Sequence, residues 1–170
     1  MPPAGRILGI DPGLNVTGYA VLEPSTAGPR VVEAGVVRGT PSPGKADLAR
    51  RLRDLYDGIV EVIDQFHPDL MVVEQLYAHY DHPGTAILMG HARGVIFLAG
   101  GQRDIPVRSF NATRIKKTVT GSGRAPKAQI QRVVQRELGL AKPPEPPDVA
   151  DALAVALCAY HLSGRSLADD

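Results

Sequence analysis

The segment LGIDPGLNVTG, residues 8–18, places an acidic residue at the end of a predicted buried strand. Residues 6–11 form a nearly continuous apolar run, which is typical of a strand covered on both faces of a sheet. Asp11 closes this run, and the Pro and Gly that follow it favour a sharp turn. An Asx turn would account for a single aspartate at this position. A functional role for Asp11 requires other acids at the same edge of the sheet.

The rest of the chain predicts a mixed sheet with helices. Residues 15–23 and 30–39 flank the turn-forming segment PSTAGP, so the first three strands are expected to form an antiparallel meander. Apolar spacing from residue 46 to residue 66 predicts an amphipathic helix, and a strand at 69–74 should then run parallel to a neighbour. Further helices are expected at 84–101, 111–119, 126–138 and 148–162, with a short strand at 105–110. This order indicates an α/β fold with helices on the faces of the sheet.

The composition is typical of one globular domain, expected to cover residues 1–170 with a frayed tail at 162–170. The single cysteine, Cys158, cannot form an internal disulfide. The N-terminus lacks the pattern of a signal peptide, and the longest apolar segment, 86–101, is interrupted by a histidine and an arginine. We therefore expect a cytoplasmic protein without a membrane segment.

Positive charge is concentrated in one part of the chain. Residues 103–136 contain nine Lys or Arg residues and one acid, Asp104, which gives +8 there and −7 elsewhere for the net charge of +1. A solvated helical surface is one interpretation of such a stretch. The other is a surface that binds a polyanion such as a nucleic-acid backbone.

Three further acids accompany Asp11. Glu74 ends the apolar run DLMVV as Asp11 ends the first strand, and neighbouring strands lie about 4.8 Å apart. Asp148 and Asp151 are three residues apart and so share one face of a helix. A competing interpretation makes Asp148 the N-cap of that helix and Asp151 its N3 residue.

Taken together, the four acids favour a metal site. Clustered carboxylates repel one another and take up protons unless a cation compensates them. Oxygen ligands suit Mg²⁺ or Mn²⁺ better than zinc, and two such ions can promote hydrolysis of a phosphodiester. The basic stretch would then bind the phosphates of the substrate.

Five segments, in order and spacing, resemble the bacterial RuvC family of Holliday junction resolvases: LGIDPGLNVTGYAV, VVEQLY, GHARGV, KKTVTGSGRAPKAQI and DVADALAVAL. The resemblance covers about residues 7–161. It implies an RNase H-like fold, with a five-stranded mixed sheet whose first three strands are antiparallel. It also implies a Mg²⁺-dependent homodimer with two ions per subunit, Mn²⁺ as a substitute, and paired cuts on two like-polarity strands of four-way junction DNA. The RuvA–RuvB branch-migration complex is the implied partner in recombination and repair.

The family's residues carry over by position. Its catalytic and metal-binding acids match Asp11, Glu74, Asp148 and Asp151. Its aromatic residue, usually Phe, is Tyr77, and its junction-binding lysines match Lys116 and Lys127; Lys117 and Arg124 are added as DNA-binding residues. The segment 78–89 lacks the family's Asn-containing pattern, so the role of this segment and the sequence preference of cleavage stay open.

Other activities compete with this interpretation. A YqgF-like RNase H-like nuclease would act on a different branched or hybrid substrate. An actin-like or sugar kinase would need a second phosphate loop and normally a longer chain. A non-catalytic DNA-binding module would leave the four acids without a role.

The predicted helix at 84–101 is apolar on nearly every side, which favours burial on more than one face. Gly90 and Gly94 would let a second helix approach closely, and a two-fold dimer would supply two active sites. We therefore expect a homodimer interface here, with Ile96 and Leu98 pointing outward. In the alternative, the helices at 126–138 and 148–162 cover the surplus face within one chain.

Overall fold

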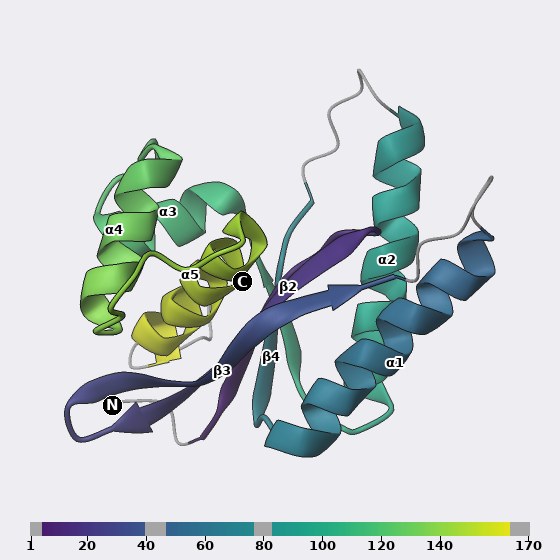
Figure 1. The fold of residues 1–170 in the computed structure, drawn as a ribbon, viewed down its shortest axis with the longest axis horizontal. Helices are drawn as coiled ribbons and strands as arrows, with labels where there is room; N and C mark the ends of the chain where they lie inside the picture. The colour runs from purple at the N-terminus through teal and green to yellow at the C-terminus, as the bar shows by residue number, and fades with distance from the viewer. Residues whose placement is uncertain (1–4, 40–46, 77–82, 164–170) are drawn as a thin grey trace.

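The computed structural model describes residues 5–39, 47–76 and 83–163, and a five-stranded mixed sheet lies at its centre (Figure 1). The strands are β1 (Ile7–Asp11), β2 (Val16–Ser25), β3 (Gly28–Arg38), β4 (Leu70–Glu74) and β5 (Val107–Phe110). They lie in the order β3-β2-β1-β4-β5. β1 pairs antiparallel with β2 and β2 with β3, whereas β4 runs parallel to β1 and to β5. The predicted meander and mixed sheet are confirmed.

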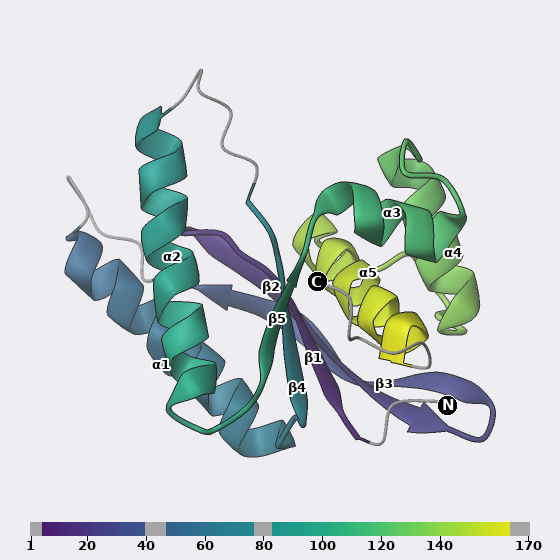
Figure 2. The same ribbon diagram turned by 180° about the vertical axis from the view of Figure 1, so that it is seen from behind.

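Within the described residues, five helices cover the two faces of this sheet (Figures 1 and 2). The helices α1 (Leu48–Phe66) and α2 (Pro83–Gly101) lie on one face, and α3 (Ala112–Thr120), α4 (Lys127–Glu137) and α5 (Pro147–Ser163) lie on the other. Leu8 and Ile10 of β1 enter the core shared with α1 and α2, whereas Ile7 enters the core shared with α5. Successive side chains of a strand point to opposite faces, so both faces of β1 are buried.

Two glycines let α5 approach the sheet more closely than any other residue would allow. A Cβ atom on Gly9 of β1 would lie 2.5 Å from the carbonyl oxygen of Ala152. A Cβ atom on Gly18 of β2 would lie 2.0 Å from the carbonyl oxygen of Asp148. Gly18 is the register partner of Asp11. The backbone of α5 is therefore fixed beside the end of β1.

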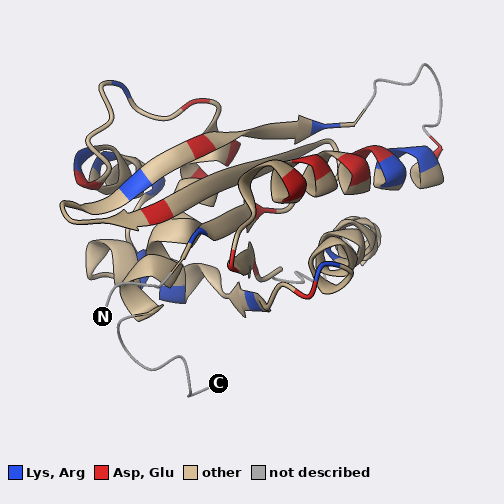
Figure 3. Ribbon diagram, turned by 90° about the horizontal axis from the view of Figure 1, so that it is seen from below, with Lys and Arg blue, Asp and Glu red and all other residues tan. Residues whose placement is uncertain are grey.

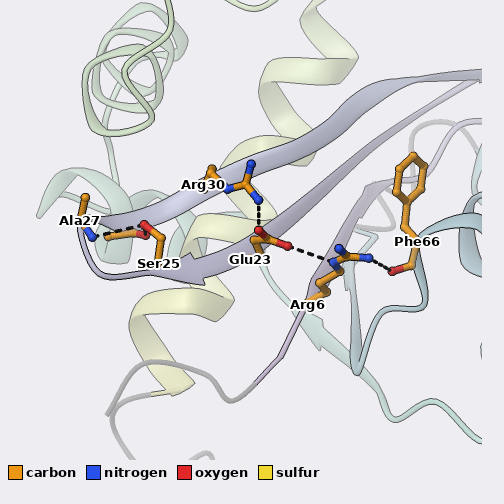
Figure 4. A network of polar contacts seen from close by, with 7 residues as sticks. Arg6, Glu23, Ser25, Ala27, Arg30 and Phe66 are labelled. Carbon is orange, nitrogen blue, oxygen red and sulfur yellow. Dashed lines mark hydrogen bonds and ion pairs between the residues drawn. The ribbon is translucent and has the colours of Figure 1, made fainter.

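The β2–β3 hairpin is longer than the sequence predicted. The segment PSTAGP was expected to be a turn, but Ser25 pairs with Gly28 and only Thr26 and Ala27 lie between the strands. The Ser25 hydroxyl donates to the carbonyl of Gly28 at 2.7 Å and accepts from the Ala27 amide at 3.3 Å (Figure 4). These contacts satisfy the backbone at the tip, so the strands continue past Pro24.

An arginine–glutamate network supports the same hairpin (Figure 4). Glu23 of β2 forms ion pairs with Arg6, at 3.1 Å, and with Arg30 of β3. Arg6 also donates to the carbonyl of Phe66 at the end of α1, at 2.8 Å. The network therefore connects the hairpin to the far end of α1.

The outer face of α2 differs from the prediction in one residue. Ile96 is fully buried with Ala92 and Ala99 against the sheet, so the expectation that it points outward is wrong. Ile87 and Leu98 are 63% and 51% exposed, and Leu98 points outward as expected. α4 and α5 lie on the opposite face of the sheet and do not cover this surface (Figures 1 and 2). No helix among the described residues is long and apolar enough to cross a membrane.

Candidate active site

Asp11 and Glu74 meet at one edge of the sheet. β1 and β4 are parallel neighbours, with Ile10 in register with Val73, and the next residue of each strand is the acid. The two carboxyl groups share a hydrogen bond. Strand pairing continues one residue further, where the Gln75 amide donates to the carbonyl of Phe110 at 2.8 Å. Pairing on both sides therefore fixes the backbone that carries Glu74.

Asp148 and Asp151 reach this edge from the first turns of α5. The close contact at Gly18 places the backbone of Asp148 beside β2 at the level of Asp11. The helix begins at Pro147, so Asp148 lies inside the first turn and is not the N-cap residue. Proline at the first helical position explains this start, because its fixed φ suits a helix and its missing N–H would have no partner there. The capping interpretation of Asp148 is therefore wrong.

The four acids interact electrostatically. Burial raises the pKa of Asp11 to about 8, with further contributions from the charges of Glu74, Asp151 and Asp148. Burial and then the charge of Asp151 raise the pKa of Glu74, whereas its hydrogen bond with Asp11 and the charges of Lys127 and Lys116 act in the opposite direction. Without further positive charge, the cluster therefore retains a proton near neutral pH.

Two lysines and two of these acids line one cavity. The cavity has a volume of about 260 Å³ and is bordered by Glu74, Asp151, Lys116 and Lys127, with apolar residues of α3, α4 and α5 completing its wall. The Lys127 ammonium lies 2.9 Å from a carboxylate oxygen of Asp151. This contact and the charges of the other aspartates raise the pKa of Lys127. The sequence did not predict this ion pair.

The carboxylates do not form a ready-made metal cage. Among the described residues, no group of three or more His, Cys, Asp or Glu residues is arranged to hold a metal ion. The contacts explain this, because Asp11 and Glu74 bond to each other while Asp151 bonds to Lys127. The donors are nonetheless all oxygen and carry excess negative charge, which fits Mg²⁺ or Mn²⁺. A divalent ion would have to replace the shared proton or the lysine.

The other predicted DNA-binding residues lie further out. Lys117 and Arg124 are exposed and do not border the cavity. Tyr77 and the first part of the divergent segment, through residue 82, lie outside the described residues.

The remaining charge is segregated across the sheet. Acidic residues follow one another along most of α1, whose N-terminal end is basic (Figure 3). Arg103, at the start of the basic stretch, pairs with Asp64 of α1 at 2.5 Å. The rest of the stretch forms β5, α3 and α4, which continue away from α1 (Figure 2). A polyanion is therefore attracted to the side of the molecule that carries α3 and α4.

The chain is similar in sequence and in fold to known proteins. The family model described as crossover junction endodeoxyribonuclease RuvC matches residues 7–159. A crossover junction endodeoxyribonuclease RuvC of Rhodopirellula baltica is 52% identical over 166 residues, covering 96% of this chain and 90% of the relative. The protein of that name in Moorella thermoacetica is 44% identical over 152 residues, covering 89% of each chain. A structure of Thermus thermophilus RuvC in complex with Holliday junction substrate has a TM-score of 0.83 and 27% identity, covering 94% of this chain and 96% of that one.

Proposed function

Because the chain belongs to the RuvC family of crossover junction endodeoxyribonucleases, we propose that it resolves Holliday junctions during recombination and DNA repair. The reaction is hydrolysis of one phosphodiester bond in each of two strands of like polarity. The supporting observation is the convergence of Asp11, Glu74, Asp148 and Asp151 at one sheet edge beside basic helices.

The four acids are the proposed catalytic and metal-binding residues. Their carboxylate oxygens would hold two Mg²⁺ ions per subunit, with Mn²⁺ as a substitute. Bound ions of this kind activate a water molecule and stabilise the leaving oxygen of a phosphodiester. The strand ends and the Gly18 contact hold the carboxylates in place before substrate arrives, so no large rearrangement of the backbone is needed.

DNA binding is assigned to the basic side of the molecule. Lys116 and Lys127 border the cavity and would contact phosphates next to the cut, whereas Lys117 and Arg124 would contact phosphates further away. Tyr77, three residues after Glu74, would stack on an unpaired base at the junction. The acidic surface of α1 would repel DNA and so orient its approach.

A homodimer formed through α2 would supply the two cuts. The outer surface of α2 carries exposed apolar residues, and Cβ atoms at Gly90 and Gly94 would meet no atom within 4 Å. Neither α4 nor α5 lies on this side, so a second copy is the proposed occupant. In a cytoplasmic setting, the RuvA–RuvB branch-migration complex would deliver the junction.

Cleavage of a synthetic four-way junction tests this function. The wild-type protein should cut two like-polarity strands in Mg²⁺ and none in EDTA, with cut positions mapped on all four strands. Asp11→Asn should reduce cleavage to background but retain junction binding, because phosphate contacts lie elsewhere. Asp57→Asn changes an exposed acid of α1; this variant is the matched control and should cut normally. Unpaired cuts, or preference for an RNA–DNA hybrid, would instead identify a general RNase H-like nuclease.

A further inference from the structure

Lys127 occupies a position that is unfavourable for a cation. It is the first residue of α4, the N-cap residue Pro126 makes no side-chain capping bond, and the first turn contains no acid. The N-terminus of a helix carries partial positive charge, which repels an ammonium group. Asp151 of α5 compensates this charge from across the cavity, at 2.9 Å.

The two partners of this ion pair differ in exposure. The Lys127 side chain is 61% exposed, whereas that of Asp151 is only 24% exposed. A lysine head on a flexible four-carbon stem can rotate into solvent, and ion pairs of this exposure contribute little to stability. Asp151 is held by the buried helix α5. The lysine can therefore leave the pair at little cost, and the aspartate stays.

Lys116 provides a comparison in the same cavity. It borders the cavity and its charge acts on Glu74, yet it makes no ion pair with any residue in the part of the chain that the structure describes. Both lysines therefore contribute to the local field, but only Lys127 occupies a carboxylate that a metal ion would need.

We propose that Lys127 is an exchangeable counter-ion, which neutralises Asp151 until a divalent cation takes its place and then binds a DNA phosphate. This exchange of Lys127 for a metal ion rests on the proposed metal-dependent function. It specifies how binding of the metal and binding of DNA favour each other. A divalent ion at Asp151 displaces the ammonium group, which becomes available to a phosphate at the mouth of the cavity. The metal thereby raises the affinity for DNA. Because coupling between two binding sites is reciprocal, DNA that binds Lys127 raises the affinity for the metal by that same factor. The protein therefore binds a divalent ion more weakly in the absence of DNA than in its presence.

Metal binding without DNA gives the first test. Free Mn²⁺ is measured by electron paramagnetic resonance with wild type, Lys127→Met and Lys116→Met, and thermal melts establish that all three are folded. Lys127→Met should bind Mn²⁺ about two to five times more tightly, the upper part of the range for an ion pair of this exposure. Lys116→Met removes an equal charge from the same cavity without breaking the pair, and should change the affinity less than about twofold.

The outcomes separate the two proposals. An equal gain in Mn²⁺ affinity in Lys127→Met and Lys116→Met would show that only the positive charge in the cavity matters, and not the ion pair. That result would overturn the exchange but leave the proposed metal site in place. If neither wild type nor Lys127→Met bound Mn²⁺ at millimolar concentration, the metal-dependent function would be overturned as well.

The salt dependence of junction binding gives the second test. The slope of log K against log salt is measured with and without Ca²⁺, on junctions confirmed to be uncut by denaturing gel. With Ca²⁺, the wild-type slope should be steeper than that of Lys127→Met by about 0.9, the value for one phosphate contact. Without the ion, the slopes of wild type and Lys127→Met should differ by less than this value, because Asp151 competes with phosphate for the lysine. A difference that does not change on adding Ca²⁺ would overturn the exchange.

Discussion

The helices α2 and α5 are both apolar around most of their circumference, but their surroundings differ. α5 is packed between β1 and β2 on one side and α3 and α4 on the other, and an unbroken run from Ala152 to Ala159 is buried. α2 packs on the sheet and on α1, and leaves Ile87 and Leu98 exposed. The same sequence pattern thus accompanies a central helix in one case and an open apolar surface in the other. Only the number of neighbouring layers distinguishes the two.

The largest expected effect tests which residues of α2 belong to the core. Ile96→Glu places a charge in a fully buried site without a partner, and should prevent folding or lower the free energy of unfolding by more than about 3 kcal/mol. Leu98→Glu, two residues away, should change the free energy of unfolding of the monomer by less than about 0.5 kcal/mol. Urea denaturation measures both values.

Sedimentation of Leu98→Glu and of wild type tests the open surface. Leu98→Glu should be a folded monomer where wild type is a dimer, because the new charge would be desolvated in an interface. Its cuts in a four-way junction should no longer be paired. A wild-type monomer at micromolar concentration, with paired cutting intact, would contradict a dimer through α2.

An intermediate effect tests the closeness of packing at α5. Gly9→Ala puts a Cβ atom 2.5 Å from the Ala152 carbonyl oxygen, so α5 must move, and overpacking of this kind costs about 1–3 kcal/mol. The melting temperature should fall by about 2–4 °C for each kcal/mol. Gly94→Ala in α2 meets no atom within 4 Å and should leave the fold intact or stabilise the helix. An equal fall in melting temperature in Gly9→Ala and Gly94→Ala would contradict the difference in packing between α5 and α2.

The last expected effect depends on pH and concerns Asp11, at the end of β1 beside the start of α5. The pKa of Asp11 rises from 3.8 to about 8 in the folded, metal-free chain, so the native state binds this proton more tightly than the unfolded state. Stability is therefore lost as pH rises toward 8, and Asp11→Asn should lose less. Melting temperatures in EDTA at pH 5 and pH 8 measure the difference. A gap between variant and wild type that does not widen with pH would contradict the raised pKa.

The sequence predicted the architecture well because strand ends and helical periodicity are local signals. The two acids at strand ends and the pair in α5 were found from position alone, and the structure brings them together. The orientation of Ile96 was not predictable in this way, because a helix that is apolar on all sides has no periodicity to mark its inner face. The Lys127–Asp151 pair joins residues from two helices and depends on packing. Pro147 before Asp148 did carry a signal, since proline often begins a helix.

The bond from Gln75 to Phe110 has a consequence for the diversification of this protein. It secures the backbone just beyond Glu74, so changes in length or composition after Leu76 need not move the carboxylate. We therefore expect the sequence after Leu76 to tolerate divergence without displacing Glu74. A chain in which the segment between Leu76 and Pro83 is exchanged for that of a relative should therefore keep its catalytic carboxylates in place.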